Sequence, residues 1–406
     1  MGRHDRHPDL VGPLRRALTR STRVLDLLPA QTPLLPKVLG ECAMLVHAAA
    51  PLRGAMPWLR DAVDGLADRV AAGTRTRETA LRILLEPAHA LDHASAHLLL
   101  RSAGYPDPAF DQHVLSATAP GRRRTPGPER LPHRELEQRW LGRILGLPDD
   151  DGEAALLAAS ALGRPLDPLA ATRLDVYAFT HCVMYAHDLG RRSPSLPRPP
   201  GEVLADAEAG LALAVDSGDL DLAVELLLTW PLMGVPLGPA PGHVLDRVLR
   251  TEARLGFLPG LGHDPAHDET TALLANYHPT TVMGMFAALA VRAGTEVAVP
   301  LPADPAGTAA VAAAWPGPVP SWVAEALTAT PPASGIEPLV LTAALRTAVG
   351  RVDLEAVRAL LTVALEHDLE LGPAVRAATG LVARLSRPGA PWERAEVSPS
   401  AAPRPA

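Results

Sequence analysis

Apolar residues recur every three or four positions along almost the whole chain, whereas strand-like alternation of apolar and polar residues is nearly absent. This spacing places apolar side chains on one face of an α-helix, where they can pack against a neighbouring helix. Glycine and proline residues separate the periodic stretches. We therefore predict helices over residues 10–28, 33–50, 56–72, 76–103, 132–146, 152–162, 168–189, 201–217, 220–229, 242–255, 268–276, 280–293, 306–314, 320–329, 337–349, 353–367 and 372–386.

A short pattern at two helix–helix junctions indicates how neighbouring helices are connected. It reads Gly-Asp-Leu-Asp-Leu at 218–222 and Gly-Arg-Val-Asp-Leu at 350–354. We expect the glycine to end one helix in a left-handed turn and an aspartate to cap the next helix, as in an αα-hairpin. Recurring αα-hairpins build an open α-solenoid or a closed α/α barrel, also called a toroid. The sequence therefore predicts an all-α fold of stacked αα-hairpins, in either form.

Proline-rich segments predict where the chain divides. Its 406 residues exceed the size of about 250–300 residues at which single hydrophobic cores stop growing. The segment 191–200 reads as a stiff linker, which predicts an N-terminal helical half at 1–190 and a C-terminal helical half at 200–386. The Pro-, Ala- and Ser-rich tail at 387–406 is expected to be disordered.

Composition narrows the partners and the compartment. Apolar residues make up 47% of the chain and the net charge is −7, so a large core is possible and nucleic acid is not expected as a partner. The sequence contains no window of about 18 uncharged apolar residues, so it predicts no membrane span. The two cysteines cannot form a disulfide framework, and the polar N-terminus at 1–9 leads into no signal-peptide pattern. We expect a cytoplasmic protein, and the sequence does not determine its oligomeric state.

Rare residue types help to locate a site. Lys37 is the only lysine and Asn276 the only asparagine, and tyrosine occurs four times, a bias typical of a very G+C-rich genome of the actinobacterial type. In such a chain a scarce residue type is slightly more informative. Two segments concentrate these residues.

The first segment carries a narrow polar stripe on an otherwise apolar helix. At about 100° per residue, Tyr177, His181, Tyr185 and Asp188 share one face, with Thr180 beside it. Tyrosine and histidine can form an acid–base pair, with the aspartate orienting a partner. The alternative is a satisfied hydrogen-bond network between packed helices.

The second segment is Asn276-Tyr277-His278-Pro279-Thr280-Thr281, directly before an apolar helix. Free N–H groups and a positive dipole end at such a helix start suit an anion or a developing oxyanion. We assign catalytic roles to Tyr277 and His278 and substrate-binding roles to the asparagine and the two threonines. The alternative is a helix cap with a polar cluster.

Two further features are weaker candidates. His93 and His97 have the i, i+4 spacing of a two-histidine metal pair, so zinc is a possible cofactor, although a polar stripe between helices explains them better. Glu41 lies in an apolar helix and is a candidate buried acid that contacts substrate.

The segment 177–190 has the pattern Tyr-x-x-Thr-His-x-x-x-Tyr-x-x-Asp-x-Gly and resembles an uncharacterised all-helical family of high-G+C bacteria. The Tyr-His-x-Thr sequence at 277–280 is similar to a second feature of that family, and the resemblance covers residues 30–295. It implies no known reaction. It does imply that one site contains Thr180, His181, Tyr185, Asp188, Tyr277, His278 and Thr280.

These features favour an enzyme over other classes of protein. We expect acid–base chemistry in a helical cavity, by cyclisation, elimination or isomerisation, on a specialised metabolite or a peptide. The chain contains no Gly-rich phosphate loop, Rossmann fingerprint or Gly-x-Ser-x-Gly elbow, so we expect no redox cofactor. The alternative is a helical-repeat module that binds a peptide or protein, or a scaffold in a biosynthetic complex. An enzyme requires the two polar segments to converge, whereas an open solenoid predicts that they lie apart.

Overall fold

The computed structural model describes residues 9–29, 31–119, 128–148, 152–297, 306–329, 335–369 and 372–386. It confirms the predicted all-α class, because the described residues form helices and only an isolated bridge between Leu237 and Val297 has β character. The chain separates into two compact units. Unit 1 comprises Met1–Leu166 and Ala171–Pro302, and unit 2 comprises Asp167–Ala170 and Ala303–Ala406.

Unit 1 has outer and inner helices, which alternate along most of the chain. The outer helices are α1 (Val11–Leu27), α3 (Pro57–Thr74), α4 (Arg77–Leu85), α6 (Pro108–Thr118), α8 (Glu153–Ala159), α10 (Pro200–Asp216), α13 (Pro239–Leu255) and α14 (Glu269–Ala275). The inner helices are α2 (Leu35–Ala49), α5 (Ala90–Ser102), α7 (Pro132–Leu145), α9 (Arg173–Ala186), α11 (Leu220–Leu227) and α15 (Tyr277–Ala293). Short connecting turns are η1 (Ala50–Leu52), η2 (Pro87–His89) and α12 (Thr229–Met233).

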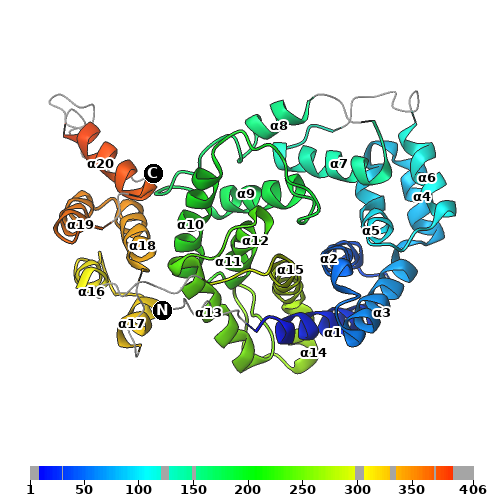
Figure 1. The fold of residues 1–406 in the computed structure, drawn as a ribbon, viewed down its shortest axis with the longest axis horizontal. Coiled ribbons are helices and arrows are strands. Elements are labelled where there is room, and N and C mark those ends of the chain that lie inside the picture. The colour runs from blue at the N-terminus through cyan, green and yellow to red at the C-terminus, as the bar shows by residue number, and fades with distance from the viewer. Residues whose placement is uncertain are drawn as a thin grey trace, which may run out of the picture. The chain divides into compact units, whose positions relative to one another are not determined.

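The inner helices close into a ring. Helix α2 packs on α5, α5 on α7, α7 on α9, α9 on α11, α11 on α15, and α15 returns to α2 (Figure 1). Helix α1 seals the junction by packing along α15, where the Ser21 and Thr281 hydroxyls lie 3.2 Å apart. Arg23 of α1 also pairs with Glu269 of α14 at 2.6 Å. Of the two predicted forms, unit 1 therefore has the closed one, an α/α toroid.

Burial explains which helices are inner and which are outer. Every residue of α11 is buried, and all of them except Asp221 and Glu225 are apolar. Helix α1 instead buries one stripe, which includes Leu14, Leu18 and Val24. A helix with a single apolar stripe can cover the ring from outside, whereas α11 must be surrounded by other helices.

The two junction patterns fold differently at their glycines. Gly218 has φ +69° and Asp219 caps α11 by accepting from the Leu222 N–H, as predicted. The prediction for Gly350 is wrong. It remains helical, and the left-handed residue is Val352 with φ +57°. The helix continues one residue farther than expected, and Asp353 then caps the next helix.

The division into units differs from the predicted halves. Segment 191–200 lies inside unit 1, between two helices of the same toroid. It is anchored there by Arg192, which pairs with Glu153 at 2.5 Å, and by Arg198, which pairs with Asp206 at 2.5 Å. The boundary falls instead near residue 302, because the ring is complete only after α15. The predicted tail at 387–406 lies outside the described residues.

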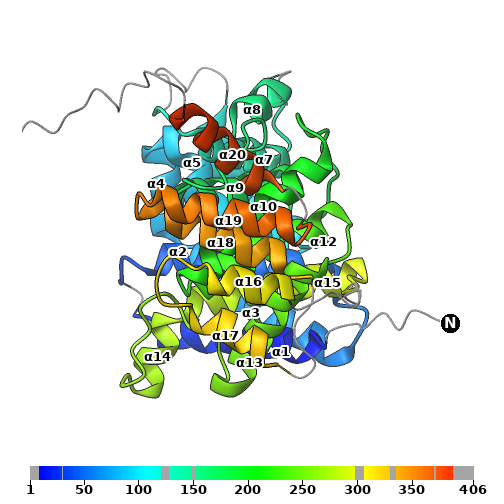
Figure 2. The same cartoon turned by 90° about the vertical axis from the view of Figure 1, so that its left-hand side faces the viewer.

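Unit 2 consists of further αα-hairpins. Its helices are α16 (Ala306–Ala313), α17 (Ser321–Thr328), α18 (Glu337–Gly350), α19 (Leu354–Glu366) and α20 (Pro373–Leu385). Helices α16, α18 and α19 pack on one another, and α20 packs on α18 and α19 (Figure 2). Arg346 donates to the Pro168 carbonyl at 3.0 Å, which ties the segment Asp167–Ala170 to this unit. Among all helices of the described chain, none combines the length and the apolar character that crossing a membrane requires.

Candidate functional site

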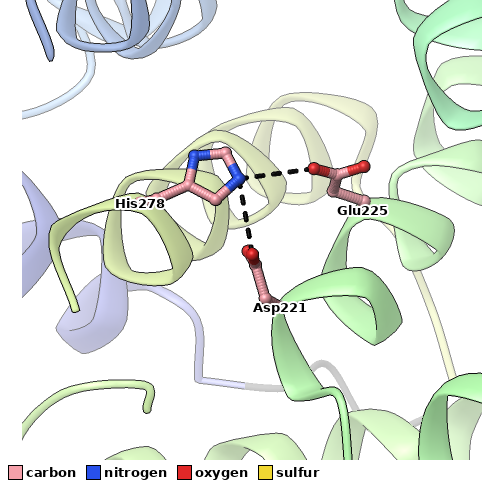
Figure 3. Close-up of side chains that lie close together, drawn as sticks. All are labelled: Asp221, Glu225 and His278. Atoms are coloured by element: carbon pink, nitrogen blue, oxygen red, sulfur yellow. Dashed lines mark ion pairs between the residues drawn. The ribbon is translucent and has the colours of Figure 1, made fainter. Parts of the chain in front are cut away.

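Two carboxylates of α11 face one imidazole of α15. Asp221 and Glu225 are four residues apart, so they project from the same side of α11. The Nε2 atom of His278 lies 3.4 Å from Asp221 Oδ2 and 3.5 Å from Glu225 Oε1 (Figure 3). Both acids are buried in the toroid, whereas a quarter of the His278 side chain remains exposed.

A third carboxylate contacts the other nitrogen of this imidazole. Glu41 of α2 places Oε2 3.0 Å from His278 Nδ1. Its other oxygen lies 3.7 Å from the ammonium of Lys37, which is mostly exposed. The His278 ring is therefore held between carboxylates from two different inner helices.

Asp221, Glu225, Glu41 and His278 form one largely buried cluster. Helix α9 contacts this cluster through Glu225. The Thr180 hydroxyl donates to Glu225 Oε2 at 2.6 Å, and His181 Nδ1 lies 3.9 Å from the same oxygen. A capping box at Thr172 and Asp175 fixes the start of this helix, and so sets which residues face inward. Glu225 thus joins the two polar segments singled out in the sequence, one on α9 and one on α15.

Burial and pairing set the charges of the cluster. Burial raises the pKa of Asp221 to about 7. Burial alone would lower the pKa of His278, but Glu225 and Glu41 outweigh it and raise that pKa to about 11. Burial would raise the pKa of Glu225, yet contacts with His278, His181 and Thr180 lower it. A protonated imidazole therefore sits among carboxylates, one of which holds its proton unusually tightly.

His181 is a neutral histidine with a defined tautomer. Its Nδ1–H donates to the Tyr177 carbonyl at 2.9 Å, which leaves Nε2 as the unprotonated nitrogen. Burial lowers its pKa and raises that of Tyr177, whose ring centroid lies 3.8 Å away. Tyr185 and His133 flank the same ring at 5.5 and 6.3 Å. At neutral pH this group offers an imidazole lone pair beside a phenol that keeps its proton.

Asp188 is located in a separate contact, at the end of α9. Its carboxylate accepts from His47 Nε2 at 3.0 Å and from the Trp140 indole. Burial would raise the pKa of Asp188, but these two donors lower it. The Trp140 ring stacks on Tyr185 at 5.1 Å, and the Tyr185 hydroxyl donates to Glu137 at 3.2 Å. The partner that Asp188 orients is thus His47 of α2 and not a histidine of the cluster.

The start of α15 is not suited to an anion. The Asn276 amide accepts from the Gly260 N–H at 2.8 Å and donates to the Ala272 carbonyl at 2.7 Å. The hydroxyls of Thr280 and Thr281 donate to backbone carbonyls one turn earlier, so they serve the local helix.

The charges nearby also oppose an anion at this position. Burial, and then Glu41, raises the pKa of Tyr277. The carboxylates of Glu41, Asp221 and Glu225 surround His278 and repel negative charge. The anion-binding role predicted for this segment therefore conflicts with its surroundings, which favour a cation.

His93 and His97, predicted as a metal pair, contact different carboxylates. His93 Nε2 lies 2.8 Å from Glu86, and His97 Nε2 lies 2.8 Å from Asp111. His97 also packs on the Phe110 ring at 4.7 Å. The structure does not bring these two imidazoles to a common ligand, because Glu86 holds the first and Asp111 of α6 holds the second.

One group of side chains in the described residues has the composition and spacing of metal ligands. Asp221, Glu225 and His278 each offer one ligand atom, and these atoms lie within 4.8 Å of one another. Sequence reasoning found His278 and missed both acids. The available signal was the pair of carboxylates four residues apart in Leu-Asp-Leu-Ala-Val-Glu-Leu-Leu, where all the remaining residues are apolar.

Fold and site together define a helical α/α toroid with a buried carboxylate–histidine cluster at the junction of four inner helices. The chain belongs to the family DUF6895, a domain of unknown function, whose model matches residues 15–288. This span includes every residue of the cluster. No curated protein and no solved structure matches the chain.

Proposed function

We propose that the toroid is an enzyme domain that performs acid–base chemistry on a small molecule or peptide. The main support for this proposal is that Glu225 contacts Thr180 and His181 through one oxygen and His278 through the other. The reaction class that fits is a cyclisation, an elimination or an isomerisation, as in the tailoring of a specialised metabolite. Each of these needs a proton removed at one atom and delivered at another.

The roles of two side chains follow from their hydrogen bonds. His181 is the proposed base, because its Nδ1–H is committed to a backbone carbonyl and its Nε2 is unprotonated. Tyr177 is the proposed acid, because its ring lies against that imidazole and it stays protonated at neutral pH. The cluster around His278 would bind and polarise the substrate.

The energetic cost of the cluster supports a functional role. Removing an ion from water costs several kcal/mol even after relaxation, and apolar residues often stabilise such positions equally well. The toroid nevertheless buries Asp221 and Glu225 in an otherwise apolar helix. Selection for stability alone does not explain this choice, whereas binding of a substrate does.

The family pattern is part of the same proposal. We propose that Thr180 and His181 of the Tyr-x-x-Thr-His segment and His278 of the Tyr-His-x-Thr segment mark this site in relatives from high-G+C bacteria. Both cysteines of the chain are free and buried, which supports action in the reducing cytoplasm.

The function is tested in cells that encode the protein. The gene is deleted and complemented with wild type, His181→Asn or His187→Asn, and metabolites are compared by mass spectrometry. His187 is a matched control, because its Nδ1–H also donates to a carbonyl four residues earlier at 2.9 Å but lies outside the cluster. A compound that accumulates in the deletion strain is then incubated with each purified protein in D₂O.

We expect wild type and His187→Asn to convert the compound with deuterium incorporated, and His181→Asn to be at least about 100-fold slower. Equal rates for all three proteins would show that His181 is not the base. A compound that binds to wild type and is never converted would favour the alternative of a binding module or scaffold.

A further inference from the structure

The spacing around His278 Nε2 matches the ligand spacing of a metal ion. Two metal–ligand bonds of about 2.1 Å that meet near the tetrahedral angle place their ligand atoms about 3.4 Å apart. The observed separations of Nε2 from Asp221 Oδ2 and Glu225 Oε1 are 3.4 and 3.5 Å. Figure 3 shows both carboxylates directed at this single nitrogen.

One buried carboxylate oxygen of this cluster has no hydrogen-bond partner in the described residues. Asp221 is only 8% exposed, and its Oδ1 atom has no hydrogen-bond partner in the described part of the chain. A buried carboxylate oxygen without a hydrogen-bond partner destabilises the folded chain. A cation held by Asp221 and its neighbours would remove this destabilisation.

The supporting contacts are those that metal sites use to orient their ligands. Metal-binding histidines usually direct the second ring nitrogen at a carboxylate, and ligating carboxylates are themselves hydrogen-bonded. Glu41 lies 3.0 Å from His278 Nδ1, and Thr180 donates to the outer oxygen of Glu225 at 2.6 Å. Each of these residues comes from a different inner helix, so the closed ring itself holds the ligands in place.

The charges also call for a cation. Three carboxylates meet one imidazole, and Lys37, which contacts Glu41, is mostly exposed. Buried charges are normally paired or bound to metals. The same cluster gives an anion no favourable partner.

We propose that Asp221, Glu225 and His278 bind one divalent first-row transition-metal ion. One imidazole and two carboxylates suit ions such as Mn²⁺ and Zn²⁺ and leave coordination positions open for water or substrate. The role of the ion in turnover rests on the function proposed above, where it would polarise a substrate oxygen close to His181. Binding itself is measured without any substrate.

The experiment titrates Mn²⁺ into the metal-free full-length chain and follows free Mn²⁺ by electron paramagnetic resonance. Pulsed measurements then detect coupling between Mn²⁺ and a ligating nitrogen. We expect one Mn²⁺ per chain with nitrogen coupling in wild type. The His278→Gln variant loses the coupling, and both His278→Gln and Asp221→Asn bind at least about tenfold more weakly. Circular dichroism checks that each variant is folded.

Asp219→Asn is the matched control. It removes a negative charge two residues from Asp221, while asparagine caps a helix as well as aspartate does. We expect its affinity for Mn²⁺ to equal that of wild type. The proposal is overturned if wild type shows no saturable binding at millimolar Mn²⁺, if nitrogen coupling survives in His278→Gln, or if Asp219→Asn weakens binding as much as Asp221→Asn. Mn²⁺ binding without deuterium exchange in the assay above would uphold the metal site and refute the enzyme.

Discussion

At the scale of single residues, surroundings decide what a buried histidine can do. His181 and His187 lie on the same segment, and each donates Nδ1–H to a carbonyl one turn earlier. Burial lowers the pKa of both. The first faces Glu225 of another helix, whereas the second has the guanidinium of Arg192 as its charged neighbour. This difference is the reason why we propose the first histidine, and not the second, as the base.

The pH dependence of stability gives a prediction for His187. Its pKa is lowered in the folded chain, so below about pH 6.5 the unfolded chain binds a proton that the folded chain does not. Stability is therefore lost as the pH falls, by up to about 1.4 kcal/mol per pH unit for one proton. We expect the free energy of unfolding of His187→Asn to fall less steeply than that of wild type between pH 7 and pH 5. Urea unfolding followed by circular dichroism measures both slopes, and parallel curves would contradict the argument.

At the scale of elements, the end of α9 explains the Asp-x-Gly portion of the sequence pattern. Asp188, Leu189 and Gly190 all have left-handed backbones, with φ values of +48°, +43° and +79°. This turn aims Asp188 at His47 of α2 and at Trp140 of α7. It therefore fastens three inner helices of the ring, and the strain of two non-glycine left-handed residues is offset by these contacts.

Gly190 has a second constraint besides its backbone. A Cβ atom added there would lie 2.0 Å from the Arg292 guanidinium. We expect Gly190→Ala to destabilise the protein by about 1–3 kcal/mol, since both the backbone and Arg292 must shift. Gly201→Ala is the control, because a Cβ there meets nothing within 4 Å and the residue is helical. It should be neutral or stabilising by up to about 1 kcal/mol. Urea unfolding compares the two, and equal losses would show that the strain is unimportant.

At the scale of the whole molecule, closure of the ring joins distant parts of the chain. Arg16 of α1 pairs with Glu252 of α13, and Ser21 of α1 contacts Thr281 of α15, 260 residues later. None of these contacts uses unit 2. The family match at 15–288 covers the ring and ends within α15.

We therefore expect residues 1–302 to fold without Ala303–Ala406, which form most of unit 2. The shortened chain should show a helical circular dichroism spectrum and a single melting transition, with a Tm within about 4 °C of the transition of the same unit in the full chain. It should also bind Mn²⁺ as the full chain does. Aggregation, or a spectrum without helix, would show that the ring depends on the C-terminal helices.

Two residues show how far sequence reasoning reaches into the site. His278 was found because it stands next to scarce residues at a helix start. Glu225 was missed because acidic residues are also common in the first turns of a helix that follows a capping aspartate, so the two acids had an ordinary explanation. The metal pair predicted at His93 and His97 had good spacing, but spacing on one helix does not fix where the other ligands come from.

The all-α class, most helix positions and two polar segments could be predicted from the sequence, because helical periodicity and capping are local properties of neighbouring residues. Closure of the hairpins into a ring, the place of 191–200 inside one unit and the two acids of α11 became visible only in the folded chain. These features depend on which helices meet across hundreds of residues. A buried charge is stable only where oppositely charged or hydrogen-bonding groups contact it, and for the acids of α11 those groups lie on other helices.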